Sequence, residues 1–243
     1  MESQLVARSC TALPDVASAA QLPSSERPEI RRELFGYRLL SPRAVGIGDV
    51  ALVGEAYHCW SESWTATLQE LDGVDHVPSD EFTRQDEIGA IFYGYECVAL
   101  CCFRYVDLSS AMHRDDSYFR VWPLSARREA CRQGQRLCIA SHFTVAASWR
   151  RSALKSSLKG ILTAVSLDRF ASSSGDALVG VTRDDRGMSK ATEGLGANIL
   201  GKSELHGVPV SLIAFYKSSR RTALAAEDEV LVRSLGAAFR GRR

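Results

Sequence analysis

The sequence predicts an α+β protein (α/β layered) built around one mixed central sheet. Segments of strand length alternate with segments of helical periodicity, most regularly in the second half of the chain. One strand segment, Glu96 to Val106, is almost continuously apolar, as expected of a strand covered on both faces. The 243 residues are 45% hydrophobic and 24% charged. A chain of this size can bury about 70% of its unfolded surface.

The first half of the chain predicts an arm followed by the start of a folded domain. Residues 1–30 are rich in Ala, Ser and Pro and lack periodicity, which indicates a flexible N-terminal arm. We expect residues 31–243 to form a single domain. Its first elements are predicted as a strand from Phe35 to Leu40, a helix from Val50 to Leu71, and strands from Glu87 to Tyr93 and Glu96 to Val106.

The second half alternates more regularly between the two periodicities. A short charged helix is predicted first and a terminal helix last. The elements expected in order are a helix from Ser125 to Gln133, a strand from Arg136 to Val145, a helix from about Ser152 to Phe170, a strand from Ala177 to Val181, a helix from Met188 to Leu200 interrupted by glycines 194 and 196, a strand from Val208 to Tyr216, and a helix from Ala225 to Phe239.

Charge and hydropathy exclude several classes of protein. The chain has 30 basic and 29 acidic side chains, a net charge of +1, so we expect no nucleic-acid partner. The longest apolar runs, such as Cys97 to Phe103, are too short for a membrane span. The first residues have neither the basic nor the apolar region of a signal peptide. We therefore expect a soluble cytoplasmic protein.

Cysteines and motifs narrow the chemistry further. Seven scattered cysteines without a CxxC pair are typical of buried thiols in a reducing cytoplasm, and no metal site is expected. The sequence contains no Walker loop, no strand–GxGxxG–helix and no GxSxG motif. Nucleotide hydrolysis, NAD-dependent redox chemistry and elbow-type serine hydrolysis are therefore not favoured.

A basic segment is the most informative local feature. Between Glu129 and Asp168 there is no acidic side chain. The basic residues in this interval are Arg132, Arg136, Arg150, Arg151, Lys155 and Lys159. Four of them flank the start of a predicted helix, where free N–H groups and the helix dipole favour anions. The segment indicates a site for a phosphorylated cofactor arm or an acidic carrier protein; the alternative is a solvated basic face.

The same segment resembles the core of a known superfamily. The strand Leu137 to Val145, the loop Ala146-Ala147-Ser148-Trp149-Arg150-Arg151 and the following helix are similar to the GNAT N-acyltransferases, in which a basic loop after a strand binds pantetheine and phosphate. Trp122-Pro123-Leu124 and Ile139-Ala140-Ser141-His142-Phe143-Thr144-Val145 look most like the branch of acyl-homoserine-lactone synthases and N-acyl amino acid synthases. Thr192-Glu193-Gly194-Leu195-Gly196-Ala197 resembles the superfamily's Tyr-Glu-x-x-Gly-Phe helix, and the similarity in element order spans roughly residues 35 to 217.

This resemblance implies a GNAT-like mixed central sheet with helices on both faces, and an N-acyltransferase activity. A fatty acyl group would pass from a co-substrate, acyl-CoA or an acyl carrier protein (acyl-ACP) thioester, to an amine of an amino acid, small molecule or peptide. The donor-binding residues implied are Phe143, Thr144, Val145, Arg150, Arg151, Ser152, Ala153 and Lys155. Backbone amides of the first three would hold the carbonyl oxyanion, and Arg150, Arg151 and Lys155 would bind phosphate.

The departures from the family pattern matter as well. Ile139 replaces the family's strand glutamate, His142 replaces an arginine, and Thr192 replaces the tyrosine often used as general acid. The loop Arg150 to Lys155 lacks both glycines of the family signature, which makes tight wrapping of a CoA pyrophosphate less assured. A carrier protein, which presents a single phosphate on an acidic surface, suits this loop better.

Two residues are the candidates for catalysis. The base should titrate near neutrality, and His142 is the nearest histidine, although strand alternation puts it on the face opposite Ser141 and Phe143. Its alternative role is a hydrogen-bonded core histidine. Glu193, on the glycine-broken helix, would anchor a polar substrate or simply solvate the helix.

Two functions remain open at this stage. The first is an N-acyltransferase. The second is a GNAT-like binding or regulatory module for acyl thioesters or a partner protein that has lost catalysis, as the replaced residues would allow. Turnover of a thioester on addition of an amine distinguishes them.

Overall fold

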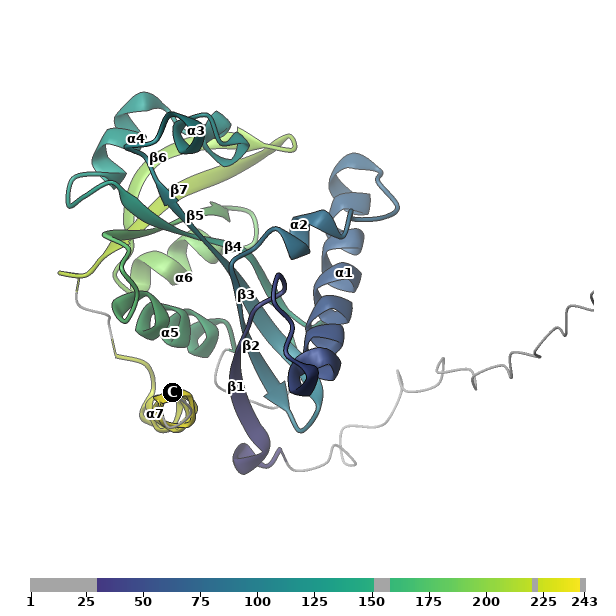
Figure 1. Ribbon diagram of the computed structural model, residues 1–243. Helices are drawn as coiled ribbons and strands as arrows, with labels where there is room; N and C mark the ends of the chain where they lie inside the picture. Colours follow the sequence, from purple (N-terminus) through teal and green to yellow (C-terminus); the bar gives the residue numbers. More distant parts are fainter. Residues whose placement is uncertain (1–29, 151–157, 220–222, 241–243) are drawn as a thin grey trace, which may run out of the picture. The chain divides into compact units, whose positions relative to one another are not determined.

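The computed structural model describes residues 30–150, 158–219 and 223–240. In this part of the chain, seven strands form one mixed sheet in the order β1-β2-β3-β4-β5-β7-β6 (Figure 1). Neighbouring strands are antiparallel except β4 and β5, which are parallel. The strands are β1 (Phe35–Leu40), β2 (Glu87–Tyr93), β3 (Glu96–Asp107), β4 (Arg136–Val145), β5 (Ala177–Arg183), β6 (Asn198–Leu205) and β7 (Val208–Tyr216).

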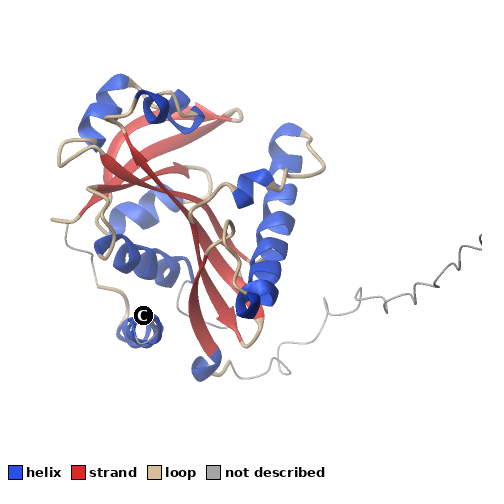
Figure 2. Ribbon diagram, viewed as in Figure 1, coloured by secondary structure: helices blue, strands red, loops and turns tan. Residues whose placement is uncertain are grey.

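Helices pack on both faces of the sheet (Figure 2). The α-helices of the described residues are α1 (Val50–Asp72), α2 (Asp80–Thr83), α3 (Ala111–Arg114), α4 (Leu124–Ala130), α5 (Leu158–Ala171), α6 (Met188–Gly194) and α7 (Ala226–Arg240), and a 3-10 segment, η4 (Ser117–Val121), precedes α4. Helices α1, α2 and α4 cover one face, while α5, α6 and α7 cover the other. This is the predicted α+β layered class with a mixed central sheet, and the prediction is confirmed.

Two apolar clusters lie on the face of the sheet that α1, α2 and α4 cover. Trp60 and Phe82 bring α1 and α2 onto β1, β2 and β3, and both side chains are almost completely buried. Trp122 and Phe119 bring η4 and the start of α4 onto β4, β5 and β7. Full burial of a large apolar side chain contributes about 1.5–3 kcal/mol. Each half of the sheet therefore carries its own helical cover.

The structure corrects one predicted element. The helix predicted from Met188 to Leu200 ends at Gly194, and β6 begins at Asn198. Gly196 has a φ of 101°, which a helix does not contain, and β6 instead forms a hairpin with β7. The turn of this hairpin is His206-Gly207, both with positive φ (53° and 69°), as in a type I′ turn.

The other predicted segments agree closely with the structure. The bounds of β1, β2, β4 and β7 are those predicted, and α1 ends one residue later. The first residues of the helix predicted from Ser152 lie outside the described residues, where α5 is seen from Leu158. Among the residues that the structure describes, no helix is long and apolar enough to cross a membrane.

Candidate functional site

The parallel strands β4 and β5 separate after a short pairing. Their register runs only from Leu137–Ala177 to Ile139–Val179, although β4 continues to Val145. On its other side β4 remains paired with β3 through Val145. Backbone N–H and C=O groups on the open side of β4 are thus available to a ligand.

A β-bulge in β4 aims His142 at this opening. Leu100 pairs with Thr144 and Cys102 with Ser141, so β4 carries one residue more than β3 over this stretch. His142 has a φ of 50°, in the left-handed region, and its Nδ1 lies 3.3 Å from Ser141 Oγ. This corrects the expectation that His142 and Ser141 face opposite sides, because the bulge interrupts the alternation on which it was based.

Helix α1 and the strand itself hold the bulge in place. Trp64 Nε1 donates a hydrogen bond to Thr144 Oγ1 at 3.0 Å, and Thr144 Oγ1 donates to the His142 carbonyl oxygen at 2.8 Å. The Trp60 and Trp64 rings pack edge-on to the imidazole, with centroids 5.6 and 4.9 Å away. The imidazole is thus oriented by two aromatic side chains on one face of α1.

The burial and charge around His142 keep its imidazole neutral. Burial, and next the positive charges of Arg84 and Arg104, lower the pKa of His142 from 6.5 to about 4. A neutral imidazole has one nitrogen free to accept a proton or hydrogen bond near pH 7. His142 therefore has the protonation state of a base, although a weak one.

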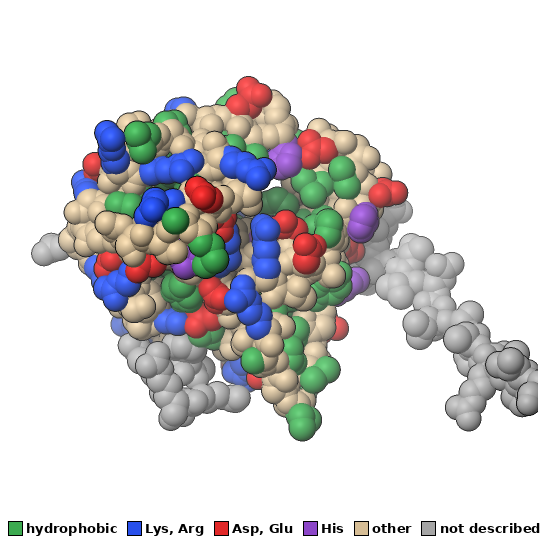
Figure 3. Space-filling model, turned by 45° about the horizontal axis from the view of Figure 1, so that its top comes forward, with side chains coloured by type: hydrophobic (Ala, Val, Ile, Leu, Met, Phe, Trp, Pro, Cys, Tyr) green, Lys and Arg blue, Asp and Glu red, His purple; other side chains and the backbone are tan. Residues whose placement is uncertain are grey.

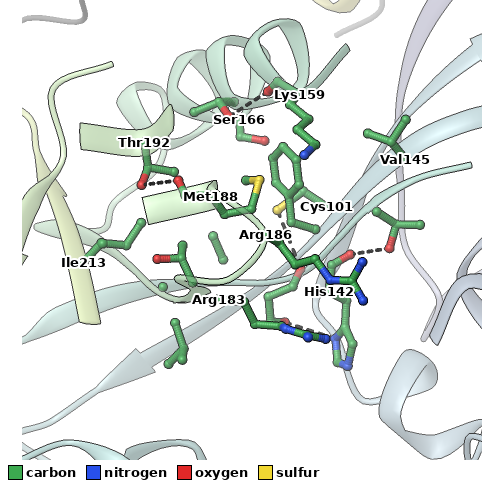
Figure 4. Close-up of a pocket in the computed structure, with 18 of the residues that line it drawn as sticks. Cys101, His142, Val145, Lys159, Ser166, Arg183, Arg186, Met188, Thr192 and Ile213 are labelled. Carbon is green, nitrogen blue, oxygen red and sulfur yellow. Dashed lines mark hydrogen bonds between the residues drawn. The ribbon is translucent and has the colours of Figure 1, made fainter. Parts of the chain in front are cut away.

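A cavity of about 370 Å³ occupies the opening between β4 and β5 (Figure 4). Side chains from α1, β4, α5, β5, α6 and β7 line it. The part of its wall that lies deepest in the sheet is apolar and consists of Leu178, Gly180, Ile213 and Phe215. Gly180 pairs with Ile213, so the missing side chain keeps this part of the cavity open.

Four cationic side chains line the same cavity: Arg150, Lys159, Arg183 and Arg186. Arg186 binds both carboxylate oxygens of Glu70 from α1, at 2.5 and 2.6 Å, and Arg183 is bidentate with Asp185 at 3.0 and 2.6 Å. Arg150 and Lys159 have no carboxylate partner in the described part of the chain. The face of the molecule drawn in Figure 3 mixes basic and acidic side chains. The unpaired charge at the cavity is thus positive and suits an anionic group of a ligand.

The buried cysteines near the cavity are not nucleophiles. Burial raises the pKa of the Cys101 thiol, which lines the cavity, to about 12. Burial also raises the pKa of the Cys138 thiol well above its usual range. Because the thiolate is the reactive form, both are protonated and unreactive near neutral pH.

A second cavity, of about 380 Å³, is also bordered by His142. It is enclosed by α1, the residues of and after α2, η4, and the β6–β7 hairpin. Both cavities are lined by Trp64, Thr67, Ala140, Ser141, His142, Val181 and Arg183. The imidazole therefore borders two spaces that meet at the bulge.

The structure assembles part of the predicted site. Phe143, Thr144, Val145 and Arg150 line the first cavity together with His142. Arg151, Ser152, Ala153 and Lys155 lie outside the described residues. Glu193 is exposed and lines neither cavity, because α6 turns Thr192 and Met188 toward the first cavity instead. The structure therefore does not bring Glu193 together with His142.

Arg183 and Arg186 are site residues that the sequence analysis does not single out. They follow directly from the end of β5 and the turn after it. Their signal in the sequence is a pair of arginines at the carboxyl end of a short buried strand, next to Asp184-Asp185. Only the separation of β4 and β5 shows that this strand end borders a cavity.

The chain has the GNAT fold, with its mixed central sheet and helices. No protein-family model matches the chain, and no curated protein matches it in sequence.

The chain is similar to many solved structures, among them FeeM and BjaI. FeeM, an N-acyl amino acid synthase from uncultured soil microbes, is 14% identical with a TM-score of 0.50, over 75% of this chain and 91% of FeeM. BjaI, a CoA-dependent acyl-homoserine lactone synthase whose structure was determined with MTA, is 12% identical with a TM-score of 0.51, over 83% of this chain and 90% of BjaI. At this level of identity the similarity establishes a common fold.

Proposed function

We propose that this protein is an N-acyltransferase that moves an acyl group, a fatty one, from a CoA or acyl-carrier-protein thioester to an amine. The observation that carries this proposal is the cavity between the separated β4 and β5, which places a neutral imidazole beside open strand backbone. The names of FeeM and BjaI, an N-acyl amino acid synthase and an acyl-homoserine lactone synthase, support the same chemistry on the same fold.

The donor fits the first cavity by its chemistry. The apolar wall of β5 and β7 suits a hydrocarbon chain, and Arg150 and Lys159 suit a phosphate of CoA or of a carrier protein's phosphopantetheine. Beyond Ile139, β5 leaves the edge of β4 unpaired; alternate backbone N–H groups up to Val145 point to this edge, while the others point to β3, as at Thr144, which pairs with Leu100. A thioester carbonyl placed there would have its developing oxyanion bound by backbone N–H groups.

The reaction needs one base. The amine nitrogen forms a bond to the thioester carbonyl carbon, and the C–S bond then breaks to release a thiolate. The nitrogen becomes strongly acidic once it is bonded to that carbon, so a weak base is enough to remove its proton. His142 accepts this proton in our proposal and passes it, directly or through water, to the thiolate sulfur.

One observation favours the alternative, a binding module without catalysis. Ile139 is buried in the core, and the Thr192 hydroxyl donates within α6 to the Met188 and Ser189 carbonyl oxygens, so neither replaces the glutamate or tyrosine that the resemblance leads us to expect. Turnover separates the two functions. Release of free thiol from a donor on addition of amines supports the enzyme, while tight donor binding without release supports the module.

The first experiment compares donors. Thermal unfolding is measured with acetyl-CoA, a long-chain acyl-CoA and an acyl carrier protein, each far above a micromolar dissociation constant. A ligand at 100 times its dissociation constant stabilises the protein by about 2.7 kcal/mol, which is readily seen. A shift with one class of donor identifies the carrier, and no shift with any donor overturns the proposal.

The second experiment removes the cations. The double variant Arg150→Glu/Lys159→Glu should raise the donor KM by about 100-fold or more, because each of the two charge-assisted bonds to phosphate contributes about 1.5–3 kcal/mol. Arg128→Glu, an exposed arginine on α4, is the matched control and should leave the donor KM unchanged. An equal donor KM in the double variant and the control removes the phosphate role.

A further inference from the structure

The second cavity contains a buried carbonyl oxygen without a hydrogen-bond donor. Gln85 is 2% exposed, and its Nε2 donates to the Glu81 carbonyl oxygen at 2.8 Å, which fixes the orientation of the amide. The Gln85 Oε1 atom is buried and has no partner among the described residues. Buried acceptors without a partner are rare in folded proteins, and a ligand N–H is one group that would satisfy this one.

The same cavity also contains an unused donor. The Tyr118 hydroxyl is buried and donates to no acceptor in the part of the chain that the structure describes. Burial raises the pKa of this phenol, so it keeps its proton. The backbone of η4 is fixed here because Asp116 Oδ1 accepts the Tyr118 N–H at 2.8 Å. Tyr118 thus holds an O–H ready for a carbonyl or carboxylate oxygen.

The rest of the lining does not favour a multiply charged group such as a phosphate. Much of it is apolar, including Leu71, Val121, Val181, Leu205 and Val208. Arg104 is paired through two bonds with Asp116, Arg84 is paired with Glu81 at 2.5 Å, and Arg183 is paired with Asp185. A phosphate would therefore find no free cation. An apolar molecule that carries one N–H donor and one acceptor oxygen fits what the cavity leaves unpaired.

We propose that Gln85 and Tyr118 bind the acceptor amine in the second cavity, and that this acceptor is an apolar amine carrying a carbonyl or carboxylate group. The Gln85 carbonyl oxygen accepts an N–H of the ligand, and the Tyr118 hydroxyl donates to its oxygen. This inference rests on the proposed N-acyltransferase function. Because both cavities share Ser141 and His142, an amine bound here reaches a thioester in the first cavity across the bulge.

The test uses three acceptors with the same apolar body: phenylalanine, phenylalaninamide and phenethylamine. Thiol release is measured with the donor that stabilises the protein. We expect the two compounds with an oxygen to have an acceptor KM about 10-fold below that of phenethylamine, the value of one hydrogen bond of about 1.4 kcal/mol. Comparison of phenylalanine with the amide distinguishes a carboxylate from a neutral carbonyl.

Two variants test the separate roles of Gln85 and Tyr118 in binding the acceptor. Tyr118→Phe should abolish the preference for an oxygen, and Gln85→Leu should raise the acceptor KM about 10-fold for all three amines, with the donor KM unchanged in both. Gln69→Leu and Tyr95→Phe, at exposed positions outside both cavities, are the matched controls. If Gln85→Leu does not fold, Tyr118→Phe decides by itself.

The outcomes separate this inference from the proposed function. Thiol release by the wild type with an unchanged acceptor KM in both variants overturns the acceptor site and leaves the acyltransferase in place. Absence of thiol release with every amine overturns the acyltransferase. Calorimetry of phenylalaninamide then still tests the cavity: binding to the wild type that Tyr118→Phe or Gln85→Leu weakens supports the site, and equal or absent binding overturns it.

Discussion

Removal of the His142 imidazole is expected to remove a defined part of this protein's sensitivity to acid. In the folded protein, burial beside Arg84 and Arg104 lowers the pKa of His142 from 6.5 to about 4. Between these two values the unfolded chain binds a proton that the folded protein does not. The stability that this group contributes is therefore fully present above pH 6.5 and is lost as the pH falls toward 4.

The size of the effect follows from the two pKa values. At pH 5 the unfolded imidazole is almost fully protonated and the folded one is mostly neutral, so the wild type loses about 2 kcal/mol of unfolding free energy relative to pH 8. Near pH 4 the loss ends, because the folded protein then binds the proton too. Since water reaches the edge of the cavity, about 2 kcal/mol is the upper value.

The assay is urea unfolding of the wild type and His142→Gln at pH 8 and pH 5. The change in unfolding free energy between the two pH values should be smaller in the variant by about 1–2 kcal/mol. Any constant effect of the substitution cancels in this difference. His58→Gln, which removes an exposed imidazole from α1, should behave like the wild type. The same pH dependence in wild type and His142→Gln would refute the reasoning.

Three further predictions concern packing, two at the site and one in the sheet. Gly180→Val should narrow the first cavity and lower turnover of a long-chain donor at least 10-fold more than that of acetyl-CoA, because a Cβ there already lies 3.4 Å from an Ile213 carbon. An equal loss with both donors would contradict this. Trp64→Phe removes the hydrogen bond to Thr144 and should lower the unfolding free energy by about 1 kcal/mol, measured by urea unfolding against the wild type. Gly89→Ala places a Cβ 2.3 Å from the Tyr37 hydroxyl oxygen and should cost about 1–3 kcal/mol; an unchanged melting temperature would count against this close packing.

Most of the secondary structure could be predicted from the sequence because it depends on local periodicity. The helical spacing of Trp60 and Trp64 gives α1 its buried face, and the apolar run of β3 reflects helices on both sides of that strand. The prediction is wrong at β6 because local periodicity does not decide the conformation there. Residues 198–200 have no strong local preference, and pairing with β7 decides their conformation.

The candidate site could be predicted only in part. The sequence indicates β4 and the arginine after it, because a strand, a basic loop and a helix follow one another along the chain. The side of the sheet that His142 faces could not be read from alternation, since the bulge depends on the register with β3. The position of Glu193 relative to the cavity could not be predicted for a related reason: which side of α6 meets the cavity depends on how that short helix packs on β5 and β7.

By itself, then, the sequence determined most of the elements and their order, with the exception of β6, as well as the layered class and the basic character of one strand end. Only the tertiary structure decided that β4 and β5 separate, that Gly180 leaves a hollow between them, and that Gln85 and Tyr118 face a second cavity with unused hydrogen-bonding groups. The physical reason is the range of the interactions. Periodicity and turn preferences act within a few residues, whereas strand pairing, burial and the shift in the pKa of His142 depend on residues far apart in the chain.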